Sequence, residues 1–202
     1  MNLYLTSKWE SPYDGVYFTE ERLPVYRVVF TAGSGKRSSS LKIDRATSDP
    51  HQNLPKYDTV AEFEFHRWDK DLLNINGTTY QAHEFFSKQT PQPAGTTNSD
   101  TAIKLGSDRI FRGTDGQEYK WTLGKKCSQL YLNSGGKQLI AAFHPRKHGL
   151  LGIRARTPPY LEITPLGMEM MDLVFCTFIY VEKIRSEREQ DDSMDWDRPG
   201  II

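Results

Sequence analysis

One apolar segment late in the chain constrains the fold more than any other feature. Residues 170–181 are almost uniformly apolar, and the residues that follow them are densely charged. Thr164 is a good helix N-cap, and Pro165 suits the first helical position because the N–H it lacks would have no partner there. Residues 165–189 are therefore predicted to form a helix. Because the first half of this helix has no polar face, it must be enclosed on all sides.

The same segment is too short to cross a membrane. A spanning helix needs about 20 mainly apolar residues. The apolar run here is well short of that length and contains Asp172. The sequence therefore predicts a buried core helix and no transmembrane segment.

The chain before this helix is patterned as short strands. Residues 60–68 alternate between two faces, and Asn76-Gly77 and Asp115-Gly116 are turn sequences typical of β-hairpins. Counting such segments gives roughly twelve strands and then one helix, which predicts a mainly β protein: an antiparallel barrel that encloses the C-terminal helix. The expected strands cover residues 2–6, 16–19, 24–31, 38–45, 60–68, 72–75, 78–86 (a return strand or a short helical turn), the two arms of 109–123, 129–133, 138–144, 150–156 and 160–163.

The expected domain spans residues 1–189, since 202 residues suit one domain with a tail. Residues 87–100 are polar and rich in Pro, Thr and Gln, and we expect a flexible loop there. Residues 190–202 are acidic and are expected to be a disordered tail.

Composition limits the classes of partner and compartment. The formal net charge is zero, so nucleic acid is an unlikely partner unless a local patch binds it. Tyr119 and Trp121 could stack on bases, but the inner face of a barrel needs the same residues, and we expect them in the core. Cys127 and Cys176 lie far apart in the chain, which favours free thiols and a reducing compartment. The start of the chain does not resemble a signal peptide, so we expect a cytoplasmic protein, with nuclear entry left open.

Two motifs resemble a fungal domain family of unknown function, the DUF6593 type. They are RIFRGTDGQEYKWTL at residues 109–123 and LEITPLGMEMMDLVFCTFIYVEKIR at residues 161–185. The opening MNLYLT and the strand EFEFHRW at residues 62–68 are also similar to that family. The resemblance spans nearly the whole expected domain.

The resemblance implies a fold and a ligand class, but no established activity. It implies a place in the tubby C-terminal, LURP-one and phospholipid scramblase-like superfamily, whose members are β-barrels around a central apolar helix. That superfamily implies binding of phosphoinositides or other membrane lipids, with nucleic-acid binding proposed for some members. No lipid-binding motif of the superfamily can be matched to this sequence residue by residue.

The sequence indicates neither a metal site nor a catalytic site. His144 and His148 have no third ligand nearby, and zinc sites usually need four. His66 lies near Asp69 but beside no nucleophile, and a GxSxG elbow is absent. The GSGK sequence at residues 33–36 lacks the spacing of a phosphate-binding loop. We therefore expect no cofactor, no metal and no catalytic residues, and the protein is predicted not to be an enzyme.

The best candidate binding residues form a basic cluster. Arg146, Lys147 and His148 share one expected loop, and Arg154 and Arg156 share a face of the next expected strand. Such side chains can hold phosphate, and each contributes about 1 kcal/mol toward an anionic membrane surface.

This cluster leads to a functional expectation. We expect a non-enzymatic binding module whose basic rim recognises an anionic phospholipid or phosphoinositide headgroup. The alternative is a protein-interaction or nucleic-acid-associated adaptor that uses the same rim. A third interpretation is that the cluster is an ordinary solvated rim in a neutral protein.

Overall fold

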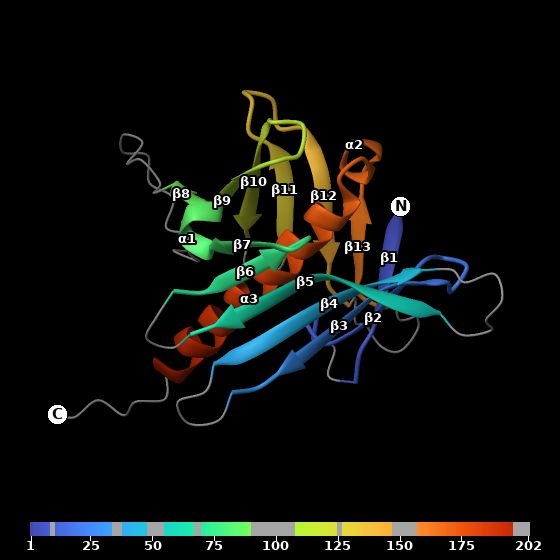
Figure 1. Ribbon diagram of the computed structural model, residues 1–202. Coiled ribbons are helices and arrows are strands. Elements are labelled where there is room, and N and C mark those ends of the chain that lie inside the picture. The colour runs from blue at the N-terminus through green and yellow to red at the C-terminus, as the bar shows by residue number, and fades with distance from the viewer. Residues whose placement is uncertain are drawn as a thin grey trace, which may run out of the picture.

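One antiparallel sheet wraps around the long C-terminal helix (Figure 1). The computed structural model describes residues 1–8, 11–33, 38–47, 55–66, 70–89, 108–124, 127–146 and 157–195. The strands are β1 (Asn2–Thr6), β2 (Gly15–Phe18), β3 (Pro24–Thr31), β4 (Ser39–Thr47), β5 (Lys56–Phe65), β6 (Leu72–Ile75), β7 (Thr78–Gln81), β8 (Ser87–Gln89), β9 (Asp108–Arg112), β10 (Glu118–Leu123), β11 (Ser128–Leu132), β12 (Leu139–His144) and β13 (Tyr160–Ile163), and the helices are α1 (Ala82–Phe85), α2 (Pro165–Met168) and α3 (Met171–Asp195).

The sheet is open, so the prediction of a closed barrel is wrong. Its strand order is β7-β6-β5-β4-β3-β2-β1-β13-β12-β11-β10-β9-β8, and within the described residues β7 and β8 are its two edges. The first and last strands, β1 and β13, pair with each other in the middle of this order. The chain between the two edge strands turns through α1, which cannot supply a ladder of hydrogen bonds between them. The expected mainly β, antiparallel architecture with a C-terminal helix is confirmed.

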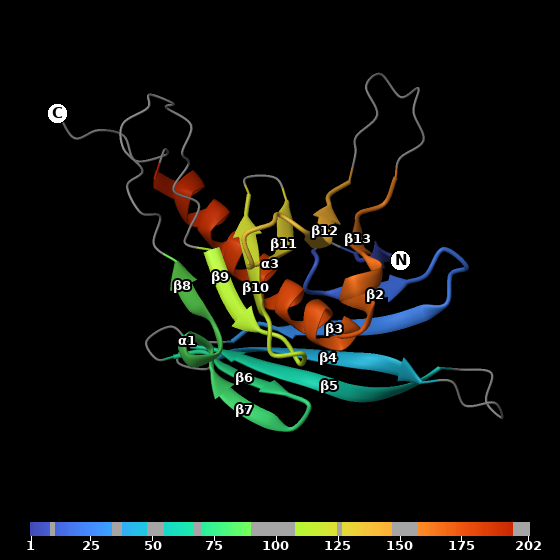
Figure 2. The same cartoon turned by 90° about the horizontal axis from the view of Figure 1, so that it is seen from above.

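The edge strands β7 and β8 do not pair with each other, and we call the place where they face each other the seam (Figure 2). Aromatic side chains pack there. The Phe86 ring stacks on Tyr180 of α3 at 5.1 Å between centroids, and Phe85 stacks on Phe111 of β9 at 6.0 Å. Tyr180 also stacks on Phe65 of β5 at 5.8 Å. Side-chain packing against α3 therefore joins the two edges where backbone pairing does not.

The first half of α3 is enclosed as predicted. Phe175 is fully buried and stacks on Tyr26 of β3 at 3.9 Å between ring centroids. The indole N–H of Trp121 donates to the Thr177 hydroxyl at 3.0 Å, which satisfies the polar group in mid-helix. Tyr119 and Trp121 are buried, so their expected place in the core is confirmed.

Asp172, the charged residue within the apolar run, is bonded to the sheet on two sides. The Tyr26 hydroxyl donates to one of its carboxylate oxygens. Arg45 of β4 donates to the other at 2.7 Å. Burial and the contact with Asp172 both raise the pKa of Tyr26, so the phenol stays protonated and remains a donor. These bonds fix the start of α3 against β3 and β4.

The C-terminal helix differs from its predicted bounds. The expected helix at residues 165–189 is two helices, α2 and α3, and α3 continues to Asp195. Gly167 in α2 packs against β12 and β13, because a Cβ atom there would lie 2.7 Å from Ile163 Cγ2 and 3.0 Å from the carbonyl oxygen of Ile140. Because α3 continues to Asp195, residues 190–195 of the expected tail are helical. Residues 196–202 lie outside the described residues.

The first charged residues after the apolar run of α3 stay inside the sheet, and exposed side chains begin at Glu187. Glu182, Lys183 and Arg185 are all buried. Arg185 donates to Glu182 through Nε and Nη2, and Lys183 pairs with Glu187 one turn further on. The Lys183 ammonium group also lies over the rings of Tyr13, Phe30 and Phe65. Mutual pairing and aromatic faces thus replace water around these charges.

The expected hairpin turns are confirmed. Asn76 and Gly77 join β6 to β7 with φ angles of 50° and 80°, as the type I′ turn requires. Gly116 lies in the turn between β9 and β10 with a φ of 78°.

Of the expected loop at residues 87–100, Ser87–Gln89 form β8, and the rest lies outside the described residues. The expected strand at residues 150–156 lies outside them as well.

Both cysteines are free thiols, as predicted. Burial raises the pKa of the Cys176 thiol, which therefore stays protonated in the core.

Within the described ranges, no helix has the length and apolar character needed to cross a membrane.

Replacement of Phe175 by aspartate tests the enclosure of α3. Phe175→Asp removes three aromatic contacts and buries an unpaired carboxylate, so we expect it to cost at least about 3 kcal/mol of the free energy of unfolding. Phe175→Leu keeps an apolar side chain and is expected to cost less than about 1.5 kcal/mol. Urea denaturation measures both values. A Phe175→Asp protein as stable as Phe175→Leu would show that the helix is not enclosed.

The buried ion pair on α3 gives a second prediction. Arg185→Met leaves Glu182 buried without its cation, which is expected to cost about 3–5 kcal/mol. Combining it with Glu182→Leu removes the stranded charge and is expected to restore most of that loss. The two variants are compared by chemical denaturation, and a double variant no more stable than Arg185→Met would contradict the pairing.

Candidate functional site

The basic cluster predicted from the sequence falls almost wholly outside the described residues. Arg146 is the one described member; it lies half-buried two residues after the end of β12. Lys147, His148, Arg154 and Arg156 lie outside the described residues, so their joint position stays a prediction. The structure does describe the two places where this chain segment leaves and rejoins the sheet.

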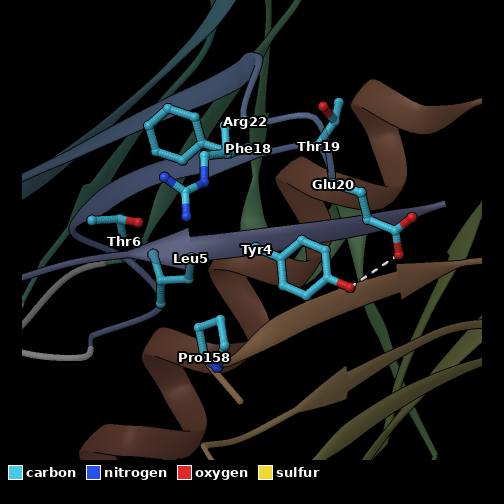
Figure 3. Close-up of a pocket in the computed structure, with 8 residues that line it drawn as sticks. All are labelled: Tyr4, Leu5, Thr6, Phe18, Thr19, Glu20, Arg22 and Pro158. Atoms are coloured by element: carbon cyan, nitrogen blue, oxygen red, sulfur yellow. Dashed lines mark hydrogen bonds between the residues drawn. The ribbon is translucent and has the colours of Figure 1, made fainter. Parts of the chain in front are cut away.

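A groove with a volume of about 510 Å³ lies on the outer face of the sheet beside the point of return (Figure 3). The alternation of β1 positions it: Leu3 and Leu5 are buried, so Tyr4 and Thr6 face outward. Phe18 of β2 is paired directly with Tyr4. We call this hollow the β1–β2 groove; its lining residues are Tyr4, Leu5, Thr6, Phe18, Thr19, Glu20, Arg22 and Pro158.

A tight turn after β2 presents Arg22 to the groove. The turn is closed by a hydrogen bond from the Thr19 N–H to the Leu23 carbonyl at 2.9 Å and one from the Arg22 N–H to the Thr19 carbonyl at 3.0 Å. Arg22 itself has a φ of 62°, a left-handed conformation that side chains with a Cβ atom seldom adopt. The Arg22 guanidinium points into the groove, between Phe18 and the strand that carries Thr6 (Figure 3).

The charges around the groove are mixed. Glu20 accepts a hydrogen bond from the Tyr4 hydroxyl at 3.1 Å. The hydroxyl of Thr19 holds the pKa of Glu21 below its ordinary value, so this turn keeps its acidic charge. Within the described part of the chain, the structure gives the Arg22 side chain no hydrogen bond and no ion pair. Arg22 is therefore available to a ligand, while both carboxylates limit how negative that ligand can be near the turn.

An aromatic row runs across the outer face next to the groove. Tyr160 of β13 is paired with Tyr4 on one side and with His144 of β12 on the other. The ring centroids of Tyr4 and Tyr160 are 5.4 Å apart, and His144 stacks on Tyr160 at 4.4 Å. His144 Nε2 lies 2.8 Å from a carboxylate oxygen of Glu162. Burial, followed by the charge of Glu162, raises the pKa of Tyr160, so the row presents a neutral phenol.

The aromatic row and the groove surround the base of the predicted basic segment. His144 is the last residue of β12 before the predicted basic segment, residues 146–156. Pro158 and Tyr160 come soon after the end of that segment. Sequence patterning could not find the row, because its three rings come from three strands whose register depends on the whole sheet. The only local signal was the outward position of Tyr4 in an alternating strand.

The model of one protein family, described as a family of unknown function (DUF6593), matches residues 10–187. The chain belongs to the DUF6593 family. This DUF6593 chain matches no curated protein and no solved structure. The family description states no activity.

In the described ranges of this DUF6593 protein, no three side chains of His, Cys, Asp or Glu are grouped so that they could hold a metal ion. His66 directly follows β5, and its Nε2 lies 3.5 Å from a carboxylate oxygen of Glu64 on that strand. His148 lies outside the described residues. The expected absence of catalysis stays a prediction.

The left-handed conformation of Arg22 can be tested by a matched pair of variants. Arg22→Gly removes the Cβ atom that disfavours this conformation, so we expect a gain of roughly 1 kcal/mol in the free energy of unfolding. Arg22→Ala removes the same charge but keeps the Cβ atom, so its stability is expected to match the wild type. Thermal and urea denaturation distinguish the two; equal stabilities would mean that the turn is not strained at this residue.

Proposed function

We propose that this DUF6593 protein is a non-enzymatic binding module that recognises an anionic phospholipid headgroup. The observation that carries the proposal is the position of the aromatic row and the β1–β2 groove at the two ends of the predicted basic segment. Basic side chains would bind the phosphate, and the aromatic rings would lie at the level of the headgroups.

The filled interior favours a ligand site on the outside. Val174, Phe175 and Phe178 of α3 occupy the centre of the sheet with no exposed surface, so the core has no room for a ligand. The β1–β2 groove lies outside this core, and its volume falls in the range of small-ligand sites.

The chemistry of the groove suits a headgroup that carries phosphate. A guanidinium forms paired, charge-assisted hydrogen bonds with phosphate oxygens, and Arg22 is directed into the groove. Tyrosine rings combine an apolar face with a polar tip, which is the property that places them at membrane interfaces. Since the net charge is zero, binding depends on this local cluster rather than on the charge of the whole protein.

The proposal includes a relation to the tubby C-terminal, LURP-one and phospholipid scramblase-like superfamily, a fungal origin and a cytoplasmic location. A sheet wrapped around an apolar helix supports the superfamily relation, and the open seam distinguishes this chain from a closed barrel. The free thiols support a reducing compartment.

Liposome co-sedimentation tests the proposal. We expect the full chain to pellet with vesicles that contain phosphatidylserine or a phosphoinositide, and not with pure phosphatidylcholine vesicles. Arg22→Ala is expected to weaken pelleting several-fold, and Arg154→Glu with Arg156→Glu to abolish it, because each charge contributes about 1 kcal/mol. Lys56→Glu, a charge reversal at an exposed position of β5, is the control and is expected to pellet like the wild type.

Two results would contradict the lipid proposal. One is the absence of wild-type pelleting with every anionic vesicle at physiological salt. The other is equal pelleting by the Arg154→Glu, Arg156→Glu variant and the wild type. If vesicles fail, the protein-interaction adaptor becomes the leading function. A nucleic-acid-associated adaptor would be recognised by an affinity that falls steeply as salt rises.

A further inference from the structure

A second hollow, of about 300 Å³, opens at the seam, and its lining is basic. His66 follows β5, Lys70 precedes β6, His83 lies on α1 and Arg109 lies on β9. These four side chains come together because the sheet does not close between β7 and β8. Among the described lining residues, the sole carboxylate is that of Asp71.

One face of α3 forms the floor of this hollow. Tyr180 and Ile184 line it, and their spacing of one helical turn places them on the same side of the helix. Arg188 follows one turn later on that side. The Nη1 atom of Arg188 is buried, and within the described residues it has no hydrogen-bond partner. Arg188 is not itself a lining residue, but its charge acts on Arg109, which places a fifth basic group next to the hollow.

Asp71 is already committed to neutral donors. One of its carboxylate oxygens accepts the backbone N–H of His66 at 3.1 Å, and the other accepts the Tyr180 hydroxyl at 3.1 Å. The nearby carboxylates of α3 are paired elsewhere: Glu187 with Lys183, and Glu189 with Arg185. Two further carboxylates lie next to lining residues, Glu64 at 3.5 Å from His66 and Asp108 beside Arg109, so it is the lining of the hollow, rather than its whole surroundings, that is basic.

One of the basic groups, Arg109, lies in a weakly solvated environment, whereas Lys70 and His83 are exposed. The Arg109 side chain is almost completely buried, and burial, followed by the charge of Arg188, lowers its pKa. The Lys70 ammonium lies 3.2 Å from Nε2 of His83. Water screens the buried charge of Arg109 poorly, so an anion that reaches it is attracted more strongly than at an exposed surface.

We infer that the seam hollow binds a phosphate group, carried either by a free phosphomonoester or by a lipid headgroup. Lysine, arginine and imidazole donors that approach from four elements suit a tetrahedral anion with several acceptor oxygens. The seam lies at the two ends of the strand order, whereas the β1–β2 groove lies near its middle. This site is therefore separate from the groove and goes beyond the proposed function.

Titration with inorganic phosphate tests the inference. The full chain is titrated at constant ionic strength while the imidazole NMR signals of His66 and His83 are followed. We expect saturable shifts at both rings. Lys70→Gln and Arg188→Gln are each expected to weaken phosphate binding about tenfold, or about 1.4 kcal/mol. Lys56→Gln is the matched control on an exposed strand position and is expected to bind like the wild type. Arg109 is left intact because its burial makes it a risk to folding.

Linear, non-saturating shifts, or unchanged affinity in both seam variants, would overturn the inference. A second arm identifies the source of the phosphate group. Glycerol 3-phosphate that shifts the same signals, without vesicle pelleting that depends on Lys70, indicates a free phosphomonoester. Pelleting with phosphatidylinositol 4-phosphate vesicles that is lost in Lys70→Gln indicates a lipid headgroup. Arg22→Ala is expected to leave phosphate binding unchanged, which separates this site from the groove.

Discussion

Enclosure of the apolar first half of α3 is the constraint on which the rest of the structure depends. A helix without a polar face gains its stability from the surrounding apolar surface, and any polar atom that it brings along must find a partner there. Asp172 is bonded to Tyr26 and Arg45, and Thr177 is bonded to Trp121. The sheet therefore both covers the helix and supplies the hydrogen bonds that the helix cannot make with water.

Both candidate binding sites lie where regular sheet geometry is interrupted. The β1–β2 groove depends on a turn that holds Arg22 in a left-handed conformation, and the seam depends on the missing ladder between β7 and β8. Strained turns and unpaired edges each cost stability, and proteins tend to retain them where they serve a function. A core that is completely filled leaves such interruptions as the natural places for a ligand.

Local patterns in the sequence predicted much of the fold and little of the candidate sites. The Asn76-Gly77 turn and the apolar run of α3 carry their own structural signal, and both were predicted correctly. The burial of Lys183 was missed because it depends on Tyr13, Phe30 and Phe65, which lie far away in the chain. The open seam and the row formed by Tyr4, Tyr160 and His144 likewise depend on strand register, which no single segment determines.

The position of α3 in the chain has a consequence for biosynthesis. All thirteen described strands precede the helix that they enclose, so a ribosome completes the sheet before its core exists. During that interval, inward side chains such as Tyr17, Leu41 and Phe63 have no helix to pack against, and exposed apolar strands of this kind attract chaperones or aggregate. Final folding must therefore wait until α3 has left the ribosome. A chain that stops before Met171 would lack the centre of its core, and no part of the remaining sheet could replace it.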